Sequence, residues 1–95
     1  MLVKIVYLGL VRSRIGKNEE QYDVAESTSL ADLLKALAEI YGEKLYSLLL
    51  TINESRLDTT VLTMVNGISI DPLKGSDVTL KEGDIVTLST LISGG

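Results

Sequence analysis

The chain has 95 residues, 45% hydrophobic residues and a formal net charge of −4, as expected for one small globular domain rather than a disordered chain. This negative charge argues against nucleic-acid binding, which normally requires a basic surface. The absence of cysteine and histidine excludes disulfides, Cys/His zinc sites and thiol nucleophiles, and it removes the usual general base. We therefore expect no catalytic residue, no metal site and no bound cofactor.

The sequence also gives expectations about location. No apolar run reaches the roughly 18 residues that a membrane-spanning helix needs. The segment Met1–Val6 lacks the charged region and small-residue cleavage site of a signal peptide. We predict a cytoplasmic protein that does not bind membranes.

A strand and a hairpin are predicted at the N-terminus. Leu2–Leu10 is rich in β-branched and apolar residues on both faces. This strand is therefore either covered on both faces, or covered on one face with an apolar surface exposed on the other. Arg12–Asn18 is predicted to be a turn, because Gly16 and Asn18 tolerate positive φ. Glu19–Glu26 alternates and would form the second strand of the hairpin.

The pattern after this hairpin predicts a helix that begins after Ser29. Ser29 is a good N-cap, and Asp32 stands at N3, where a carboxylate is favourable. Gly42 is placed to end the helix. Leucines recur at helical spacing and are expected to pack on the sheet: Leu30, Leu33, Leu34 and Leu37.

The segment Glu43–Thr60 is ambiguous. Its apolar residues fit a second short helix, and Leu48–Ile52 fits a strand equally well. We favour a helix or helical turn, followed by an exposed loop over Asn53–Thr60.

A second hairpin is predicted from Val61–Val65 and Ile68–Ile70, because the Asn66-Gly67 pair between them is a strong two-residue turn signal. Pro72 cannot donate to a strand ladder and ends this hairpin.

The last predicted strand is Ile85–Ile92, preceded by Val78–Leu80 and the polar turn Lys81–Asp84. The resulting order suits an α+β protein with a mixed sheet and one main helix packed across it. If the first and last strands lie side by side, the fold is a β-grasp, or ubiquitin-like, fold.

Two groups of residues could be mistaken for sites. The carboxylate pairs Glu19-Glu20 and Glu82/Asp84 both flank turns, which favours solvated turns over catalytic pairs. Leu8, together with Leu2, Val6 and Leu10, could form an exposed apolar patch for a partner. Burial of these side chains under the segment Glu43–Thr60 is the alternative.

An ordered set of short motifs resembles the MoaD/ThiS family of small ubiquitin-like sulfur carriers. Each motif is weak alone, but the set ends in a diglycine and spans nearly the whole chain. The matching pieces are Val3–Leu8, Val11-Arg12, Ser29–Leu34, Val65–Gly67, Leu80–Val86 and Gly94-Gly95.

The resemblance is closer to the small subunit of molybdopterin synthase than to the thiazole-synthesis carrier, because the segment Glu43–Thr60 is long. The chain departs from that subunit before the tail, where Ser89–Leu91 replaces an aromatic residue and a Pro-Pro pair. Of three apolar positions that meet partner enzymes in the family, Leu8 matches, whereas Ser69 and Ser89 do not.

The resemblance implies a domain of residues 1–92 and a flexible diglycine tail of residues 93–95. It implies that an ATP-using, ubiquitin-activating-type (MoeB-like) enzyme adenylates Gly95, which then becomes a thiocarboxylate that donates sulfur for molybdopterin, the pterin of the molybdenum cofactor. Ile92, Ser93 and Gly94 would thread into the partner's active site. The implied partner surface is Leu8, Ile68 and Leu91, and the second partner is the large subunit of molybdopterin synthase.

Other functions remain open at this point. A ubiquitin-like modifier would join Gly95 to lysines through isopeptide bonds, and a sulfur carrier could serve thiamine synthesis or tRNA thiolation instead. A stand-alone interaction domain with an incidental tail is the third alternative. Our leading interpretation is a carrier, or a small non-catalytic subunit of a synthase complex, rather than an enzyme.

Overall fold

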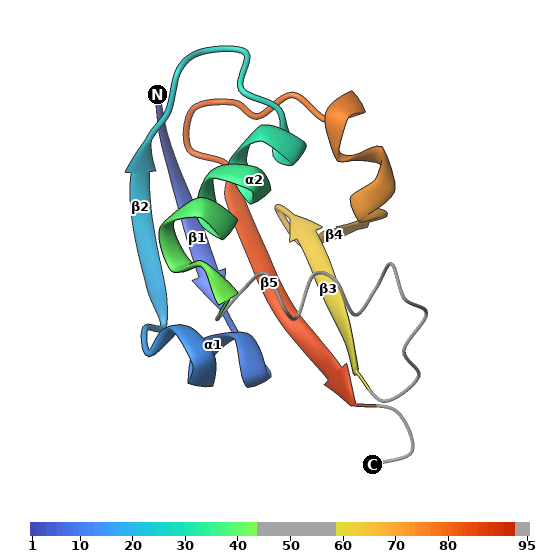
Figure 1. Cartoon of the computed structure of the whole chain (residues 1–95). Coiled ribbons are helices and arrows are strands. Elements are labelled where there is room, and N and C mark those ends of the chain that lie inside the picture. Colours follow the sequence, from blue (N-terminus) through green and yellow to red (C-terminus); the bar gives the residue numbers. More distant parts are fainter. Residues whose placement is uncertain (44–58, 93–95) are drawn as a thin grey trace.

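Strand β5 (Ile85–Ile92) lies in the centre of a five-stranded mixed sheet, parallel to β1 (Leu2–Tyr7) and antiparallel to β3 (Thr59–Val65). The computed structural model describes residues 1–43 and 59–92. β2 (Glu19–Asp23) and β4 (Ile68–Ile70) form the edges, in the order β2-β1-β5-β3-β4 (Figure 1). The first and last strands are therefore neighbours, which confirms the expected β-grasp arrangement.

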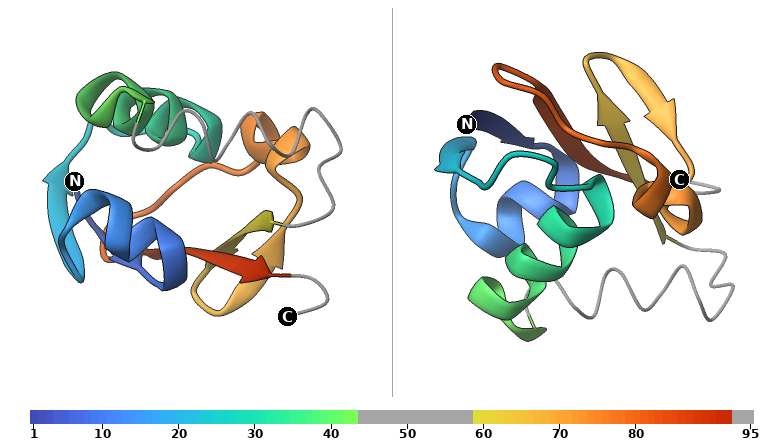
Figure 2. Two further views of the ribbon diagram at one scale, coloured as in Figure 1. Left: turned by 60° about the horizontal axis from the view of Figure 1, so that its bottom comes forward. Right: turned by 90° about the horizontal axis from the view of Figure 1, so that it is seen from above.

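In the described part of the chain, three helical segments pack against the sheet or against each other. Helix α2 (Leu30–Tyr41) lies across one face of the sheet (Figure 2), and α1 (Gly9–Ile15) lies at the end of the sheet where β1 stops (Figure 1). The 3-10 helix η1 (Pro72–Asp77) packs beside α2, so closely that a Cβ at Gly75 would lie 3.2 Å from the Ala31 amide nitrogen.

Helix α2 forms as predicted. The Ser29 hydroxyl accepts from the Asp32 amide at 3.1 Å, and the Asp32 carboxylate accepts from the Ser29 amide at 3.4 Å. This reciprocal capping box satisfies two amides at the start of the helix. The helix ends at Gly42, which has φ +58° and donates its amide to the Ala38 carbonyl. The four leucines of α2 that were predicted to face the sheet are all buried.

The predicted turn over Arg12–Asn18 is wrong, because a helix occupies most of it. The predicted strand to Leu10 stops at Tyr7, and Gly9 turns the chain with φ +61°. Val11 and Ile15, four residues apart, both enter the core and give α1 its buried side. β1 and β2 still pair antiparallel, so the hairpin partners are confirmed although a helix connects them.

Strand boundaries differ from the prediction at two further places. β3 begins at Thr59, so Thr59 and Thr60 belong to the ladder rather than to an exposed loop, and they pair with Ile92 and Leu91. β2 ends at Asp23, three residues earlier than predicted. The helix proposed within Glu43–Thr60 falls mainly on residues 44–58, outside the described residues.

The core lies between the sheet and the two α-helices. Val3, Ile5 and Tyr7 alternate inward from β1, whereas Leu2 is 48% exposed. Among the described residues, β1 is thus covered on one face, and the other face is exposed at Leu2. The remaining buried apolar residues come from the other elements: Val11, Ile15, Leu30, Leu33, Leu34, Leu37, Leu80, Val86 and Leu88.

Thr63 is a polar residue inside this core. Its side chain is fully buried, and its hydroxyl has no hydrogen-bond partner among the described residues. A buried hydroxyl without a partner loses its hydration and gains nothing in return. We expect Thr63→Val to raise the free energy of unfolding by about 1 kcal/mol, measured by denaturant titration. Destabilisation by the same amount would show that the hydroxyl is satisfied.

Candidate functional site at the end of strand β5

The end of β5 is held by the sheet up to its last residue. Leu88 pairs with Tyr7 on one side and with Thr63 on the other, and its carbonyl accepts from the Leu8 amide at 2.9 Å. The ladder with β3 continues to Ile92, which pairs with Thr59. Ser93, Gly94 and Gly95 follow directly but lie outside the described residues. The tail predicted from the sequence therefore follows a central strand.

On the β1 side, the partner of β5 changes after Leu88. β1 ends at Tyr7, and α1 begins at Gly9 (Figure 1). Here the Thr90 hydroxyl accepts from the Leu10 amide at 2.8 Å, and a Cβ at Gly9 would lie 2.6 Å from that same hydroxyl oxygen. The start of α1 and the end of β5 are thus in direct contact.

The three residues predicted for the partner surface are not all close together. Leu8, 39% exposed, follows β1, and Leu91 lies near the end of β5. These two positions are on neighbouring strands toward the same end of the sheet. Ile68, 65% exposed, lies in the edge strand β4. It pairs with Val65, which is level with the start of β5.

The predicted apolar patch on β1 is likewise divided. Leu2 and Leu8 are both exposed, but they lie at opposite ends of the strand. Leu10 belongs to α1 and is half-buried. Between the two exposed leucines, Lys4 forms an ion pair of 2.5 Å with Glu19 on the face of the sheet away from α2.

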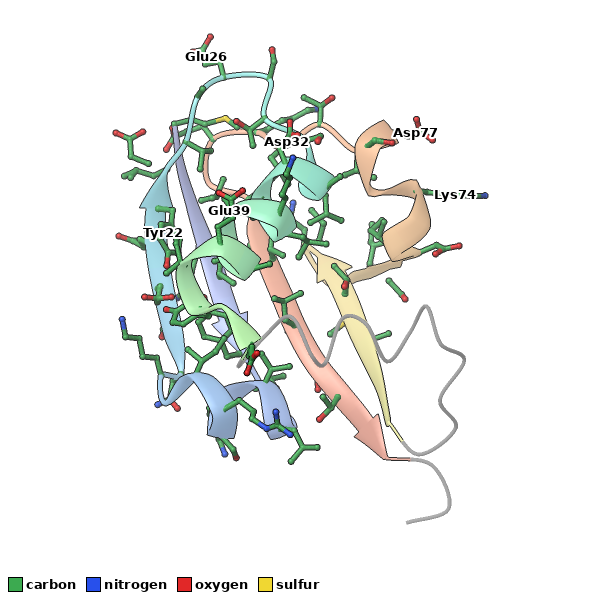
Figure 3. All side chains as sticks on the ribbon, in the orientation of Figure 1. Tyr22, Glu26, Asp32, Glu39, Lys74 and Asp77 are labelled. Atoms are coloured by element: carbon green, nitrogen blue, oxygen red, sulfur yellow. The ribbon has the colours of Figure 1, made fainter. Side chains whose placement is uncertain are left out.

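A cluster around Glu20 was missed by the sequence analysis. The hydroxyls of Tyr7 and Tyr22 donate to Glu20 Oε2 at 2.7 and 2.9 Å, and Tyr41 donates to the same atom. Lys17 Nζ donates to Oε1 at 2.8 Å. Tyr22, labelled in Figure 3, projects from β2 on the side that α2 covers. The cluster ties β1, β2 and α2 together.

The electrostatics of this cluster suit a structural role. Burial opposes the ionisation of Glu20, but the hydrogen bonds from Lys17, Tyr41, Tyr7 and Tyr22 outweigh it and lower its pKa to about 2. Burial and the adjacent carboxylate raise the pKa of Tyr7 and Tyr22. The carboxylate stays ionised and the tyrosines stay protonated, so no group is poised near neutral pH for proton transfer.

The prediction of solvated turn carboxylates is therefore wrong for Glu20, whose side chain is only 13% exposed. A signal was present in the sequence, since Glu20 and Tyr22 alternate onto one face of a strand. That face is the one that meets Tyr7, because Glu20 pairs with Ile5 and Tyr22 with Val3.

The second carboxylate pair holds a turn together. Asp84 accepts from the Lys81 amide at 2.8 Å and from the Asn66 side-chain amide at 2.9 Å. Glu82 accepts from the Leu2 amide at 3.0 Å. These contacts join the turn before β5 to the β3–β4 hairpin and to β1. Both carboxylates have structural partners.

Within residues 1–43 and 59–92, no group of three or more acidic side chains could hold a metal ion. None of the helices in this part of the chain is long and apolar enough to cross a membrane.

Comparison with solved structures shows which proteins share this fold. The HVO 2177 protein of Haloferax volcanii has a TM-score of 0.78 at 23% identity, with 100% of this chain and 87% of that chain covered. The small archaeal modifier protein 1 of Methanosarcina acetivorans has a TM-score of 0.70 at 22% identity, covering 99% and 96%. A putative molybdopterin converting factor, subunit 1, of Pyrococcus furiosus has a TM-score of 0.63 at 20% identity, covering 94% and 95%.

Sequence comparison gives the family. No curated protein sequence matches the chain. The ThiS family matches over residues 5–95, nearly the whole chain, and the match extends through the diglycine. The β-grasp topology, with β5 leading from the centre of the sheet to that diglycine, agrees with this match. The chain therefore belongs to the ThiS family and has a ubiquitin-like β-grasp fold.

Proposed function

We propose that this protein is a sulfur carrier whose Gly95 carboxylate is adenylated and then converted to a thiocarboxylate. The observation that carries this proposal is the family match through Gly95, combined with a central strand that is anchored up to Ile92. The body of the protein would act as a rigid holder for a reactive main-chain group.

The chemistry needs no side chain of the carrier. A terminal carboxylate has a pKa near 3.5 and is a charged, poor electrophile at neutral pH. Its oxygen attacks the α-phosphorus of ATP, which releases pyrophosphate and leaves an acyl adenylate. A sulfur donor at the oxidation level of hydrosulfide then attacks the acyl carbon, and AMP leaves with the bonding electron pair. The absence of cysteine and histidine from the chain is consistent with this route.

The tail sequence suits a narrow active site. Ser93, Gly94 and Gly95 can reach about 10 Å beyond β5, at about 3.3 Å per residue. Glycine has no Cβ, so its backbone can approach an adenylating site closely. Because Ile92 pairs with Thr59, we assign Ile92 to the anchored base of the tail and residues 93–95 to the threading segment.

Molybdopterin synthesis is our proposed destination of the sulfur. The supports are the long segment Glu43–Thr60 and the structural likeness to the Pyrococcus furiosus molybdopterin converting factor subunit. The proposed partners are an ATP-using adenylating enzyme and the large synthase subunit, which would contact Leu8, Leu91 and Ile68. The chain itself would bind no cofactor and catalyse no step.

A second candidate function is protein modification through Gly95. The structural likeness to an archaeal modifier protein favours it, since the same acyl adenylate can transfer to a lysine amine as well as to sulfur. Diglycine remnants on lysines of digested cell proteins are its expected trace. Sulfur delivery to thiamine or tRNA is the remaining alternative for the carrier.

Intact-mass measurement tests the proposal. The protein is incubated with ATP, a cognate activating enzyme and a sulfur donor. We expect its mass to rise by the difference between sulfur and oxygen, with the change located at Gly95 by fragmentation. Omission of ATP is the control. An unchanged mass with an enzyme that binds the protein would refute the carrier function.

A further inference from the structure

The contact between Thr90 and the start of α1 has no assigned role in the proposed adenylation of Gly95. α1 begins after Leu8, whose side chain makes no capping hydrogen bond. Leucine is a poor N-cap, because the first amides of a helix need an acceptor. That acceptor comes from a strand 80 residues away, since the Thr90 hydroxyl receives the Leu10 amide at 2.8 Å. The end of β5 therefore caps α1.

Gly9 makes this contact possible. Its φ of +61° lies in the left-handed region, and a Cβ here would lie 2.6 Å from the Thr90 hydroxyl oxygen and 3.3 Å from both the Thr90 amide nitrogen and its carbonyl oxygen. A side chain at this position would displace the Thr90 hydroxyl. Because glycine has no Cβ, the Gly9 backbone can lie directly against Thr90.

Thr90 lies in the part of β5 that pairs with a strand on one side only, just before the tail. Up to Leu88, β5 is hydrogen-bonded on both sides, but its ladder with β1 ends there and the ladder with β3 continues alone to Ile92. A strand held along one edge can twist or swing about that edge. Thr90 supplies the hydrogen bond to α1 on the other side, two residues before the end of β5.

We propose that Thr90, seated against Gly9 and Leu10, is a positioning residue that sets the direction in which the chain leaves the sheet toward Gly95. This assignment rests on the proposed function of Gly95. Ile92, the proposed base of the tail, follows Thr90 by two residues, so a shift of β5 at Thr90 moves the point from which residues 93–95 reach the activating site. Misplacement by about 1 Å can slow a reaction up to a hundredfold. Leu8 and Leu91 of the proposed docking surface adjoin this contact, whereas Ile68 lies on β4 away from it. We therefore expect the displacement to change kcat more than KM.

Three variants separate positioning from simple stability. Thr90→Val keeps the branched shape but removes the acceptor, whereas Thr90→Ser keeps the hydroxyl. Thr63→Val is the matched control, because it makes the same substitution in β3 at a hydroxyl without a partner among the described residues. Each variant is assayed with ATP and the activating enzyme by pyrophosphate release, well below its melting temperature, and Leu10 amide exchange is followed in parallel.

For Thr90→Val we expect kcat of adenylation to fall by about threefold to tenfold with KM within about twofold, and the Leu10 amide to lose its exchange protection. Thr90→Ser should restore both, and Thr63→Val should behave as wild type. An unchanged kcat for Thr90→Val, or a serine variant as slow as the valine variant, would overturn the assignment while the carrier function stands. If the wild-type protein is not adenylated at all, the carrier function fails and the assignment fails with it. Loss of thermal stability alone, with kcat intact, would reduce Thr90 to a structural cap.

Discussion

Deletion of Gly95 is expected to abolish adenylation and leave the fold intact. The reactive group in the proposed function is the carboxylate of this residue, so a chain that ends at Gly94 presents its carboxylate about 3.3 Å short of the activating position. The described core lies within residues 1–92, and the β5 ladder ends at Ile92. We therefore expect the free energy of unfolding to change by less than about 0.5 kcal/mol. Pyrophosphate release and denaturant titration measure the two effects.

A control for this deletion lies on η1. Asp77 is exposed and, as Figure 3 shows, lies at the end of the molecule away from the end of β5. Asp77→Asn should be adenylated like the wild-type protein. If the deletion lowers stability by more than about 1 kcal/mol, the tail packs on the body and is not free to enter a partner. Full adenylation of the shortened chain would place the reactive group elsewhere.

Glu20→Gln is expected to be the most destabilising single exchange of similar shape. Four donors converge on the Glu20 carboxylate, three of them tyrosine hydroxyls on Oε2. Loss of the charge weakens each of these charge-assisted hydrogen bonds and turns amide hydrogens toward buried donors. The pKa of Glu20 is lowered from 4.5 to about 2, and a change of one in pKa corresponds to about 1.4 kcal/mol, so we expect a loss of about 3 to 4 kcal/mol.

The neighbouring residue supplies the control. Glu19 alternates to the other face of β2, is 52% exposed and pairs with Lys4. Surface ion pairs of this kind contribute at most about 1 kcal/mol. Glu19→Gln should therefore have a small effect, measured by the same denaturant titration at pH 7. Equal losses of unfolding free energy in Glu19→Gln and Glu20→Gln would contradict the proposal that Glu20 stabilises the contact between β1, β2 and α2.

The same cluster predicts a pH dependence. The pKa of Glu20 is lower in the folded protein than in the unfolded chain, so its contribution is complete above about pH 5 and is lost as pH falls from about 4.5 toward 2. The stability difference between wild type and Glu20→Gln should shrink by more than half between pH 7 and pH 3. A difference that stays constant over this range would mean that Glu20 titrates normally in the folded state.

Sequence patterns predicted the elements whose signals are local. The capping box of α2 and the Asn66-Gly67 turn depend on residues within four positions of each other, and both occur as expected. The motif set also gave the family, because its pieces extend over nearly the whole chain up to Gly94-Gly95. The helix α1 was missed for the opposite reason. The acceptor for its Leu10 amide is Thr90, which is 80 residues away in the sequence. Only two of its side chains, Val11 and Ile15, are buried, so its apolar periodicity is weak.

The sequence by itself therefore determined the family, the main helix, the β3–β4 hairpin and the pairing of β1 with β2. It excluded cysteine and histidine chemistry by composition. Only the tertiary structure decided where polar groups meet. Glu20, predicted to be a solvated turn residue, accepts hydrogen bonds from three tyrosines in the structure. Thr90 accepts a hydrogen bond from the start of α1. Both contacts join residues far apart in the sequence, so they form only when β1 pairs with β2 and β5. The alternation of Glu20 and Tyr22 places the two side chains on one face of a strand, but it does not show that Tyr7 and Tyr41 meet them there.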